Sequence, residues 1–323
     1  MTIDSQLEDW QEFLLRAERR FHEVLLISRD EAPGLVSDKL LKTIDRVRQV
    51  EPNEFDSFIW NHGGVAGEIQ QTFNLVNQWS HDLFRLCVWI KVYEEFERTL
   101  GPDTDADWKP LWELRDWAID PLAYFCMLQP SGLKWRLAAV AEHALHVANR
   151  AVVPGYRDEL EQDGHAPGAW RRLDRIIGQV ERLGTARSWL RYRAFRELLG
   201  QLDSKGYEKT SRNFRNLAAH GFAPRFEMGP VITMNRRIGP WTKLEQQEDG
   251  SYAQIEVRGT KAVSYGFGEL RPLSYKDAYS ANRAQYAVAM RTMAAFQELV
   301  EELTMAMNAR LPTRRIEPTT PRP

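Results

Sequence analysis

The chain is organised around residues 211–222, which carry the sequence SRNFRNLAAHGF. Helical spacing puts Arg212, Asn216 and His220 at positions i, i+4 and i+8, so that they form one polar stripe. The apolar positions of the same segment also follow helical spacing, and they are Phe214, Leu217 and Gly221. The last of these, together with Pro224, is typical of a helix end. The pattern predicts a helix with one polar side and one side that packs against the protein.

Two side chains of this segment suit chemistry on phosphates. The imidazole of His220 belongs to a residue type that gives and takes protons near neutral pH. The guanidinium of Arg215 carries a permanent charge and a donor geometry that fits phosphate oxygens. The pair therefore favours phosphoryl chemistry on a polyanion. The structural alternative is that both side chains only satisfy helix ends and backbone carbonyls.

Arg215, Asn216 and His220 also match a known motif. Their arrangement, an arginine, a polar residue, three further residues and a histidine, resembles the signature of the HEPN superfamily (higher eukaryotes and prokaryotes nucleotide-binding). The resemblance implies a helical bundle that carries the motif on one of its helices. In catalytic members of the family, the motif makes a metal-independent endoribonuclease, usually from two copies that face each other across a dimer.

The resemblance assigns roles to single residues. It implies that Arg215, Asn216 and His220 are catalytic, and Arg212 on the same stripe is expected to hold an RNA phosphate. We expect no metal and no other cofactor, because the ribose 2′-hydroxyl of RNA supplies the nucleophile. The motif supplies one histidine from each chain, and a single histidine cannot be acid and base at once, so a homodimer is expected.

Active family members often act as toxins or in defence against phage, which implies RNA as a partner and a cognate antitoxin or regulatory protein as another. Two alternatives stay open. One is a catalytically silent HEPN-type protein that binds nucleotide or a partner protein. The other is a purely structural helical protein, since a fold alone does not license a function.

The composition fits a globular protein of a reducing compartment. The chain has 323 residues, 43% of them hydrophobic and 27% charged. Cys87 and Cys126 lie in apolar helical patterns, which indicates buried thiols. No apolar run approaches the roughly 20 residues of a membrane span, and the first residues do not resemble a signal peptide, so we expect a cytoplasmic protein without a membrane partner. Residues 168–225 hold 13 basic and 5 acidic side chains, a net charge of +8 that favours a phosphate-rich partner.

Apolar periodicity predicts a mainly α-helical protein. The expected helices cover Ile3–Arg29, Ser37–Val50, Val65–Leu100, Trp108–Leu128, Gly132–Val152, Trp170–Leu183, Ala186–Leu202, the segment at 211–222, and a last helix that starts at Ser274 and ends near Arg310. A kink is expected at Pro121. His143 and His146 are spaced as two metal ligands would be, but without a third ligand a packing role is favoured.

The segment after Pro224 no longer shows the apolar spacing of a helix. Four short strands are expected between 231 and 267, with a hairpin turn at Glu248-Asp249-Gly250. The expected organisation is an N-terminal helical extension over 1–62, a HEPN-like bundle over 63–310 with a small antiparallel β insert at about 229–269, and a disordered tail over 311–323.

Overall fold

The computed structural model describes residues 3–33, 64–100, 109–157 and 171–310. The helix expected over Ser37–Val50 and the tail over 311–323 lie outside the described residues, as do Trp108 and Trp170, where two further helices were expected to begin. The described part is mainly helical and contains a small antiparallel sheet, as expected, and this sheet has two strands.

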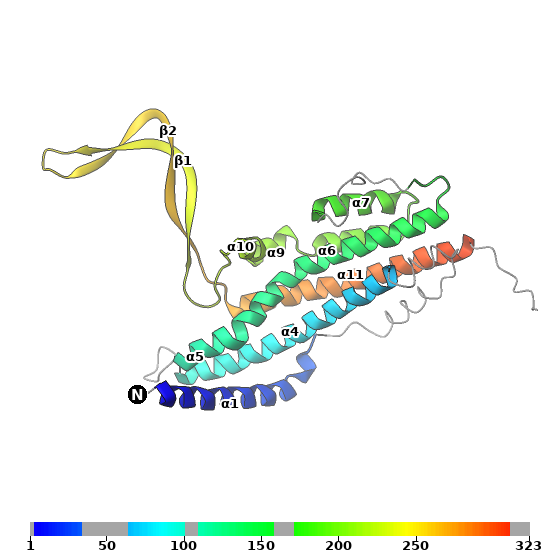
Figure 1. The fold of residues 1–323 in the computed structure, drawn as a ribbon, viewed down its shortest axis with the longest axis horizontal. Coiled ribbons are helices and arrows are strands. Elements are labelled where there is room, and N and C mark those ends of the chain that lie inside the picture. Colours follow the sequence, from blue (N-terminus) through cyan, green and yellow to red (C-terminus); the bar gives the residue numbers. More distant parts are fainter. Residues whose placement is uncertain (1–2, 34–63, 101–108, 158–170, 311–323) are drawn as a thin grey trace, which may run out of the picture.

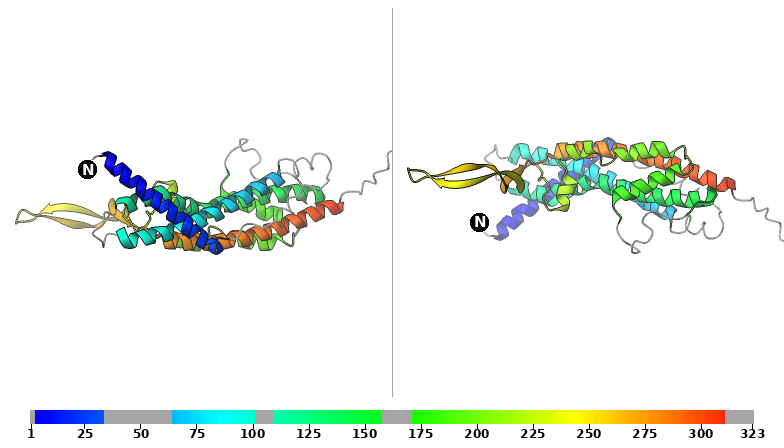
Figure 2. Two further views of the ribbon diagram at one scale, coloured as in Figure 1. Left: turned by 90° about the horizontal axis from the view of Figure 1, so that it is seen from below. Right: turned by 90° about the horizontal axis from the view of Figure 1, so that it is seen from above.

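Four long helices form the body of the molecule (Figure 1). They are α1 (Ile3–Ile27), α4 (Val65–Leu100), α6 (Asp120–Val152) and α11 (Tyr275–Arg310). Helix α6 packs against both α4 and α11, while α1 packs on α4 and crosses the bundle obliquely (Figure 2). The bounds of α4 are those expected, because its apolar residues recur at helical spacing from end to end.

The segment before α6 differs from the expectation. Two separate helices were expected, but α5 (Lys109–Leu114) and a π-helical turn, η2 (Arg115–Ile119), lead into a single α6 that runs through Pro130. Pro121, where a kink was expected, lies in the first turn of α6, directly after the π-helical turn, and a proline is tolerated at such a position. Buried residues lie on both sides of Pro130, and their packing outweighs the proline's cost of about 3 kcal/mol.

The shorter helices are η1 (Arg29–Glu31), which follows α1, and α7 (Leu173–Thr185), α8 (Tyr192–Gln201), α9 (Lys205–Thr210) and α10 (Phe214–Ala219). Helix α7 packs on α6, and α8 packs on α11. The α7–α8 turn brings the Tyr192 ring against Gly184, where a Cβ atom would lie 2.5 Å from that ring. Ser188, in this turn, has a φ angle of 56°, which a right-handed helix does not allow, so α8 starts later than the expected Ala186.

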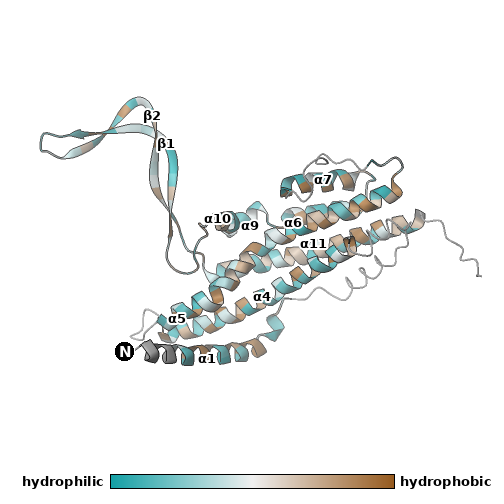
Figure 3. Cartoon of the chain, in the orientation of Figure 1, coloured by the Kyte–Doolittle hydropathy of each residue, from teal (hydrophilic) through white to brown (hydrophobic). Residues whose placement is uncertain are grey.

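A long ribbon replaces the four short strands that were expected. Strands β1 (Val231–Gln246) and β2 (Tyr252–Leu270) pair antiparallel, and the ribbon projects away from the bundle (Figure 1). A register shift between Pro240 and Trp241 marks a bulge, which accommodates a proline that cannot donate to the ladder. The expected turn at Glu248–Gly250 is confirmed, with Gly250 at φ +81°. Hydrophobic residues recur along the ribbon as well as along the bundle helices (Figure 3).

Other local expectations are also confirmed. The Ser274 hydroxyl accepts a hydrogen bond from the Asp277 N–H at 3.0 Å, which caps α11 at its expected start. Cys87 and Cys126 are buried free thiols, and burial raises the pKa of Cys126. None of the helices that the structure describes is long and apolar enough to cross a membrane.

A column of aromatic rings connects the bundle, the ribbon and α10. Phe226, just before β1, stacks on Phe214 at a ring distance of 5.5 Å and on Tyr275 at 5.7 Å. Tyr124 of α6 meets Phe214 edge to face at 5.2 Å, and Tyr93 of α4 meets Tyr275 in the same manner at 5.7 Å. The column therefore fixes α10 and the ribbon base against three long helices.

A buried arginine crosses the base of this column. Arg115, in the π-helical turn, donates from Nε to the Tyr275 hydroxyl at 3.1 Å and from Nη2 to the Phe226 carbonyl at 2.6 Å. The Tyr275 hydroxyl donates in turn to the Asp120 carboxylate. Burial raises the pKa of Asp120 above its ordinary value of 3.8, although Tyr275 and Arg115 act in the opposite direction.

Replacing Phe214 with alanine is expected to lower the free energy of unfolding by about 3–5 kcal/mol, because the ring is fully buried between two others. The measurement is chemical denaturation followed by circular dichroism. Phe222→Ala is the control, since this ring in the same segment is 48% exposed, and a change of about 1 kcal/mol or less is expected. Equal losses in both variants would contradict the assigned role of the column.

Asp120 predicts a pH dependence of stability. A carboxyl with a raised pKa binds more protons in the folded state, so its contribution to stability falls as the pH rises from its unfolded pKa through its folded pKa. The unfolding free energy of Asp120→Asn minus that of the wild type should therefore increase as the pH rises above about 4, the ordinary pKa of an aspartate. Denaturation series at several pH values measure this difference, and a flat or falling difference would count against the buried, proton-retaining carboxyl.

Candidate functional site

The segment that carries the motif is not one helix. Helix α9 ends at Thr210, and residues 211–213 form a turn in which Arg212 and Asn213 have φ angles of 52° and 58°. Only then does α10 begin, at Phe214. The expected stripe of Arg212, Asn216 and His220 on a single helix is therefore wrong. The turn aims Phe214 into the aromatic column, and an asparagine tolerates the left-handed conformation that the turn needs.

The end of α10 follows the expectation. Gly221 has a φ angle of +76° and donates its N–H to the Ala218 carbonyl at 3.0 Å, while Phe222 donates to the Leu217 carbonyl at 2.8 Å. These two bonds form a Schellman motif, which only a residue that accepts positive φ completes without strain. His220 is the last residue before this turn and is exposed. Within the described part of the chain, its side chain makes no hydrogen bond, so the imidazole is open to solvent.

Arg215 lies on a different side of α10 and has a carboxylate partner. Its Nη1 atom lies 3.5 Å from Oδ2 of Asp203, with half of the arginine side chain exposed. Asp203 has a φ angle of 45° and donates its N–H to Oε1 of Gln285 at 2.8 Å, which holds the turn between α8 and α9. Five residues along a helix correspond to about 140° of rotation, so Arg215 and His220 point in different directions.

The remaining two motif residues make contacts within the fold. Asn216 donates from Nδ2 to the Asn213 side-chain oxygen at 2.5 Å. Arg212 donates from Nη1 to the carbonyls of Arg271, at 2.8 Å, and Pro272. Arg212 thereby ties the turn before α10 to the end of β2. Its expected contact with an RNA phosphate stays a prediction.

Arg215 opens onto a cleft with several cations. The cleft has a volume of about 710 Å³, and α6, the start of α7 and α10 form its walls. Lys134 and Arg172 line it with Arg215, and the Trp135 indole adds an aromatic wall. Burial lowers the pKa of Lys134, and Arg215 acts in the same direction while Asp203 opposes it. Asp174 also lines the cleft and pairs with Arg172 at 3.2 Å, so the lining holds three cations and one carboxylate. This excess of positive charge suits an anionic ligand.

Sequence reasoning missed two of these residues. Lys134 and Trp135 lie about 80 residues before Arg215, in a helix where only the two histidines were considered as candidate ligands. Only Arg172 belongs to the basic segment over 168–225. The adjacent lysine and tryptophan could have suggested a binding site on α6. The sequence around them does not indicate, however, that α6 and α10 line the same cleft.

The two histidines of α6 serve the fold. His143 Nδ1 lies 3.0 Å from Oε2 of Glu68, and His146 Nδ1 lies 3.1 Å from the Tyr156 hydroxyl. Both contacts agree with the expected packing role. Over residues 3–33, 64–100, 109–157 and 171–310, no three His, Cys, Asp or Glu side chains gather as a metal site would need.

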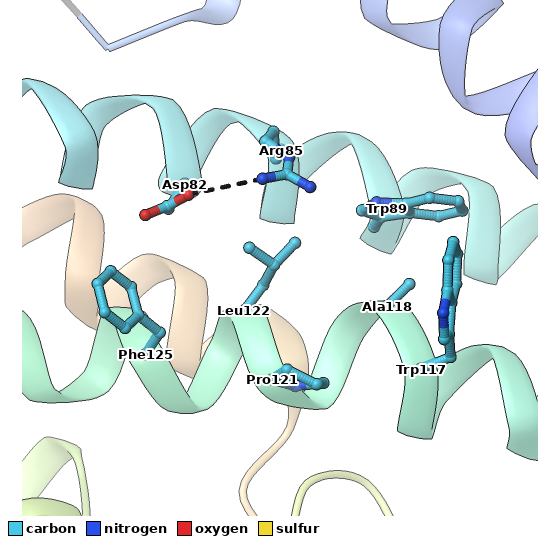
Figure 4. A pocket seen from close by; sticks show the side chains of 8 residues that line it. All are labelled: Asp82, Arg85, Trp89, Trp117, Ala118, Pro121, Leu122 and Phe125. Carbon is cyan, nitrogen blue, oxygen red and sulfur yellow. Dashed lines mark ion pairs between the residues drawn. The ribbon is translucent and has the colours of Figure 1, made fainter.

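A second cleft, of about 410 Å³, lies between α4 and the start of α6 (Figure 4). Its walls are mainly apolar and aromatic, with Trp89 and Trp117 meeting edge to face at 6.2 Å. Arg85 and the buried Asp82 carboxylate, 3.8 Å apart, bring opposite charges to one end. This cleft lacks the excess of cations that the α6–α10 cleft has, so the latter is the candidate site.

The comparisons with known proteins add no relative. Nothing matches this chain among protein-family models, curated proteins or solved structures. The candidate site therefore stands on its own geometry: Arg215 in a cationic cleft, Asn216 beside it on α10, and the exposed His220 at the end of the same helix.

Proposed function

We propose that this chain is a HEPN-type, metal-independent endoribonuclease that works as a homodimer. The observation that carries the proposal is the position of Arg215 in a cleft with Lys134 and Arg172, on the short helix that ends in an exposed histidine. The similarity of Arg215-Asn216-x-x-x-His220 to the HEPN motif points to the same chemistry, as does the mainly helical fold.

The proposed reaction uses groups that the chain holds. The ribose 2′-oxygen attacks the phosphorus while a base takes its proton, and the bond from phosphorus to the 5′-oxygen breaks as an acid protonates that oxygen. The products are a 2′,3′-cyclic phosphate and a 5′-hydroxyl. His220 acts as base or acid, Arg215 stabilises the charge on the phosphorane, and Asn216 orients the site.

A second copy of the chain completes this scheme. One imidazole cannot hold both proton-transfer roles in one step, and Arg215 and His220 point about 140° apart on α10. In a two-fold dimer, each active centre combines side chains of both copies. By the family resemblance, the biological role is that of a toxin or phage-defence effector under the control of an antitoxin or regulatory protein.

The cationic cleft gives RNA a path to α10. Lys134 neutralises a backbone phosphate, Arg172 does so once a phosphate displaces its partner Asp174, and the Trp135 indole lines the same cleft. A single strand fits this arrangement better than a duplex, because stacking on a side chain needs an unpaired base.

One observation favours a second candidate, a silent HEPN-type protein that binds nucleotide or a partner. Asp203 already pairs with the guanidinium of Arg215 at 3.5 Å. A paired arginine binds phosphate more weakly than an open one, because the carboxylate competes for the same donors. The catalytic proposal requires that a substrate phosphate displaces Asp203.

His220→Ala is expected to reduce RNA cleavage by at least about 10²–10⁴-fold, since it removes a general acid–base group, and Arg215→Ala should act similarly. The assay incubates purified protein with single-stranded RNA in EDTA and identifies the product ends. His81→Ala, at an exposed histidine on α4, is the matched control and should keep full activity. Equal cleavage by His220→Ala and wild type would reveal a contaminant. Cleavage that needs a divalent ion would overturn the mechanism, and nucleotide binding without cleavage would favour the silent protein.

The cleft predicts a salt-dependent affinity for single-stranded RNA. Lys134→Ala and Arg215→Ala should each weaken binding of an oligoribonucleotide and reduce the slope of log K against log salt by about 0.7. Fluorescence anisotropy at several salt concentrations measures both quantities. Arg193→Ala is the control, because this arginine is exposed on α8 and pairs with Glu197 at 3.0 Å. An unchanged slope in the cleft variants would place RNA elsewhere.

A further inference from the structure

The part of the ribbon nearest the bundle has two unlike faces. Residues directly opposite each other in an antiparallel pair share one face, and successive residues alternate. The register pairs Met234 with Phe267, Arg236 with Tyr265, and Ile238 with Val263. One face, the apolar ribbon face, therefore gathers Ile232, Met234, Ile238, Val263, Tyr265 and Phe267 around a single arginine.

The apolar ribbon face is open. Phe267 is 85% exposed and Ile232 is 68% exposed, and no part of the described chain covers them. A two-stranded ribbon with an uncovered apolar face has marginal stability in water, and a contiguous apolar patch commonly marks an interaction site. The face is therefore a candidate interaction surface.

The opposite face is already closed by the ribbon's own side chains. Asn235 lies across Gly268, where a Cβ atom would be 2.1 Å from its Nδ2 atom. Arg237 lies in the same way across Gly266, at 3.2 Å from the position of such a Cβ atom. These glycines let long polar side chains lie flat on the strands. Only the apolar ribbon face lacks such a cover.

We propose that this face packs on the same face of a second copy of the chain, around a two-fold axis parallel to the strands. Two packed sheets lie about 10 Å apart with nearly aligned strands. Such an axis puts β1 of each copy opposite β2 of the other. Arg236 then meets Tyr265 of the partner subunit, and a guanidinium over an aromatic ring is an attractive cation–π contact. Met234 meets Phe267 of the partner subunit, so apolar side chains meet apolar ones.

Charge selects this axis over the other two-fold arrangement. An axis across the strands would set Arg236 opposite Arg236 of the partner subunit, which places like charges in the centre of the interface. That arrangement gains only ion pairs between Glu269 and Lys261 at the rim, and exposed pairs contribute about 0–1 kcal/mol each. The parallel axis instead displaces the two guanidinium groups from each other by one strand spacing, roughly 5 Å, and sets each of them against an aromatic ring.

The parallel axis also makes the two ribbons point the same way, so that both bundles lie at the same end of the assembly. Phe226 at the ribbon base stacks on Phe214 of α10, and each motif helix therefore lies close to the ribbon base of its own copy. Pairing the ribbons brings two α10 helices to one end of the dimer. The two α10 helices could then form a joint active site, and this step rests on the proposed endoribonuclease function. The pairing of the ribbons does not depend on that function.

The first test is the mass of the protein in solution. We expect wild type to be a dimer at micromolar concentration in light scattering. The double variant Met234→Ser/Phe267→Ser should weaken the dimer by at least about 100-fold, because it removes two large apolar side chains from each copy. Leu244→Ser is the matched control, since this leucine is 71% exposed but lies beyond the bulge. A monomeric wild type, or a double variant as dimeric as wild type, would overturn the proposal.

The second test fixes the axis by disulfide cross-linking. Chains with Met234→Cys are mixed with chains carrying Phe267→Cys and oxidised; the native Cys87 and Cys126 are buried. The parallel axis predicts a link between the two variants in the mixture and none in either variant alone. A link in a mixture of Met234→Cys and Ile238→Cys chains instead would overturn the parallel axis.

RNA cleavage measured in the same samples separates this inference from the proposed function. A cross-linked dimer without cleavage supports the ribbon interface and defeats the endoribonuclease. Loss of both dimer and cleavage in Met234→Ser/Phe267→Ser supports both. Monomers that keep full cleavage would show that the ribbon interface is not used by the active protein, and they would overturn its link to catalysis.

Discussion

The contacts of Phe226 with Phe214 and Tyr275 hold the functional part of the molecule together. These three rings belong to the ribbon base, to α10 and to α11, and they stack at 5.5 and 5.7 Å. Burial of aromatic surface, unlike the half-exposed ion pair between Arg215 and Asp203, supplies enough energy to fix a short helix. The direction of α10, and with it the access of Arg215 to the cleft, follows from where Phe214 is buried.

Local signals predicted much of the fold. The bounds of α4 follow from an apolar period that is unbroken from Val65 to Leu100, and the start of α11 follows from the Ser274 cap. The end of α10 follows from Gly221. Its φ angle is positive, which glycine adopts most readily, so a glycine at this position signals a helix end. Each of these features depends on residues within one or two helical turns, which is the distance over which sequence patterns carry information.

The errors share another cause, which is contact between distant parts of the chain. The turn over 211–213 interrupts a good helical pattern because Phe214 has to reach Phe226. Helix α6 continues through Pro130 because α4 and α11 bury its flanks. Lys134 and Arg215 both line the α6–α10 cleft, and no sequence periodicity relates these two positions. Of the candidate site, the sequence therefore predicted the residues of α10 but not the cleft beside them.

The column also couples the ribbon to the motif helix. Phe226 belongs to the chain that enters β1, and the carbonyls of Arg271 and Pro272, just after β2, accept hydrogen bonds from Arg212 in the turn before α10. The segment that enters β1 and the segment that leaves β2 are thus both attached to the α10 segment, the first by ring stacking and the second by hydrogen bonds. The two attachments lie on opposite strands, so the placement of α10 and the placement of the ribbon base depend on each other.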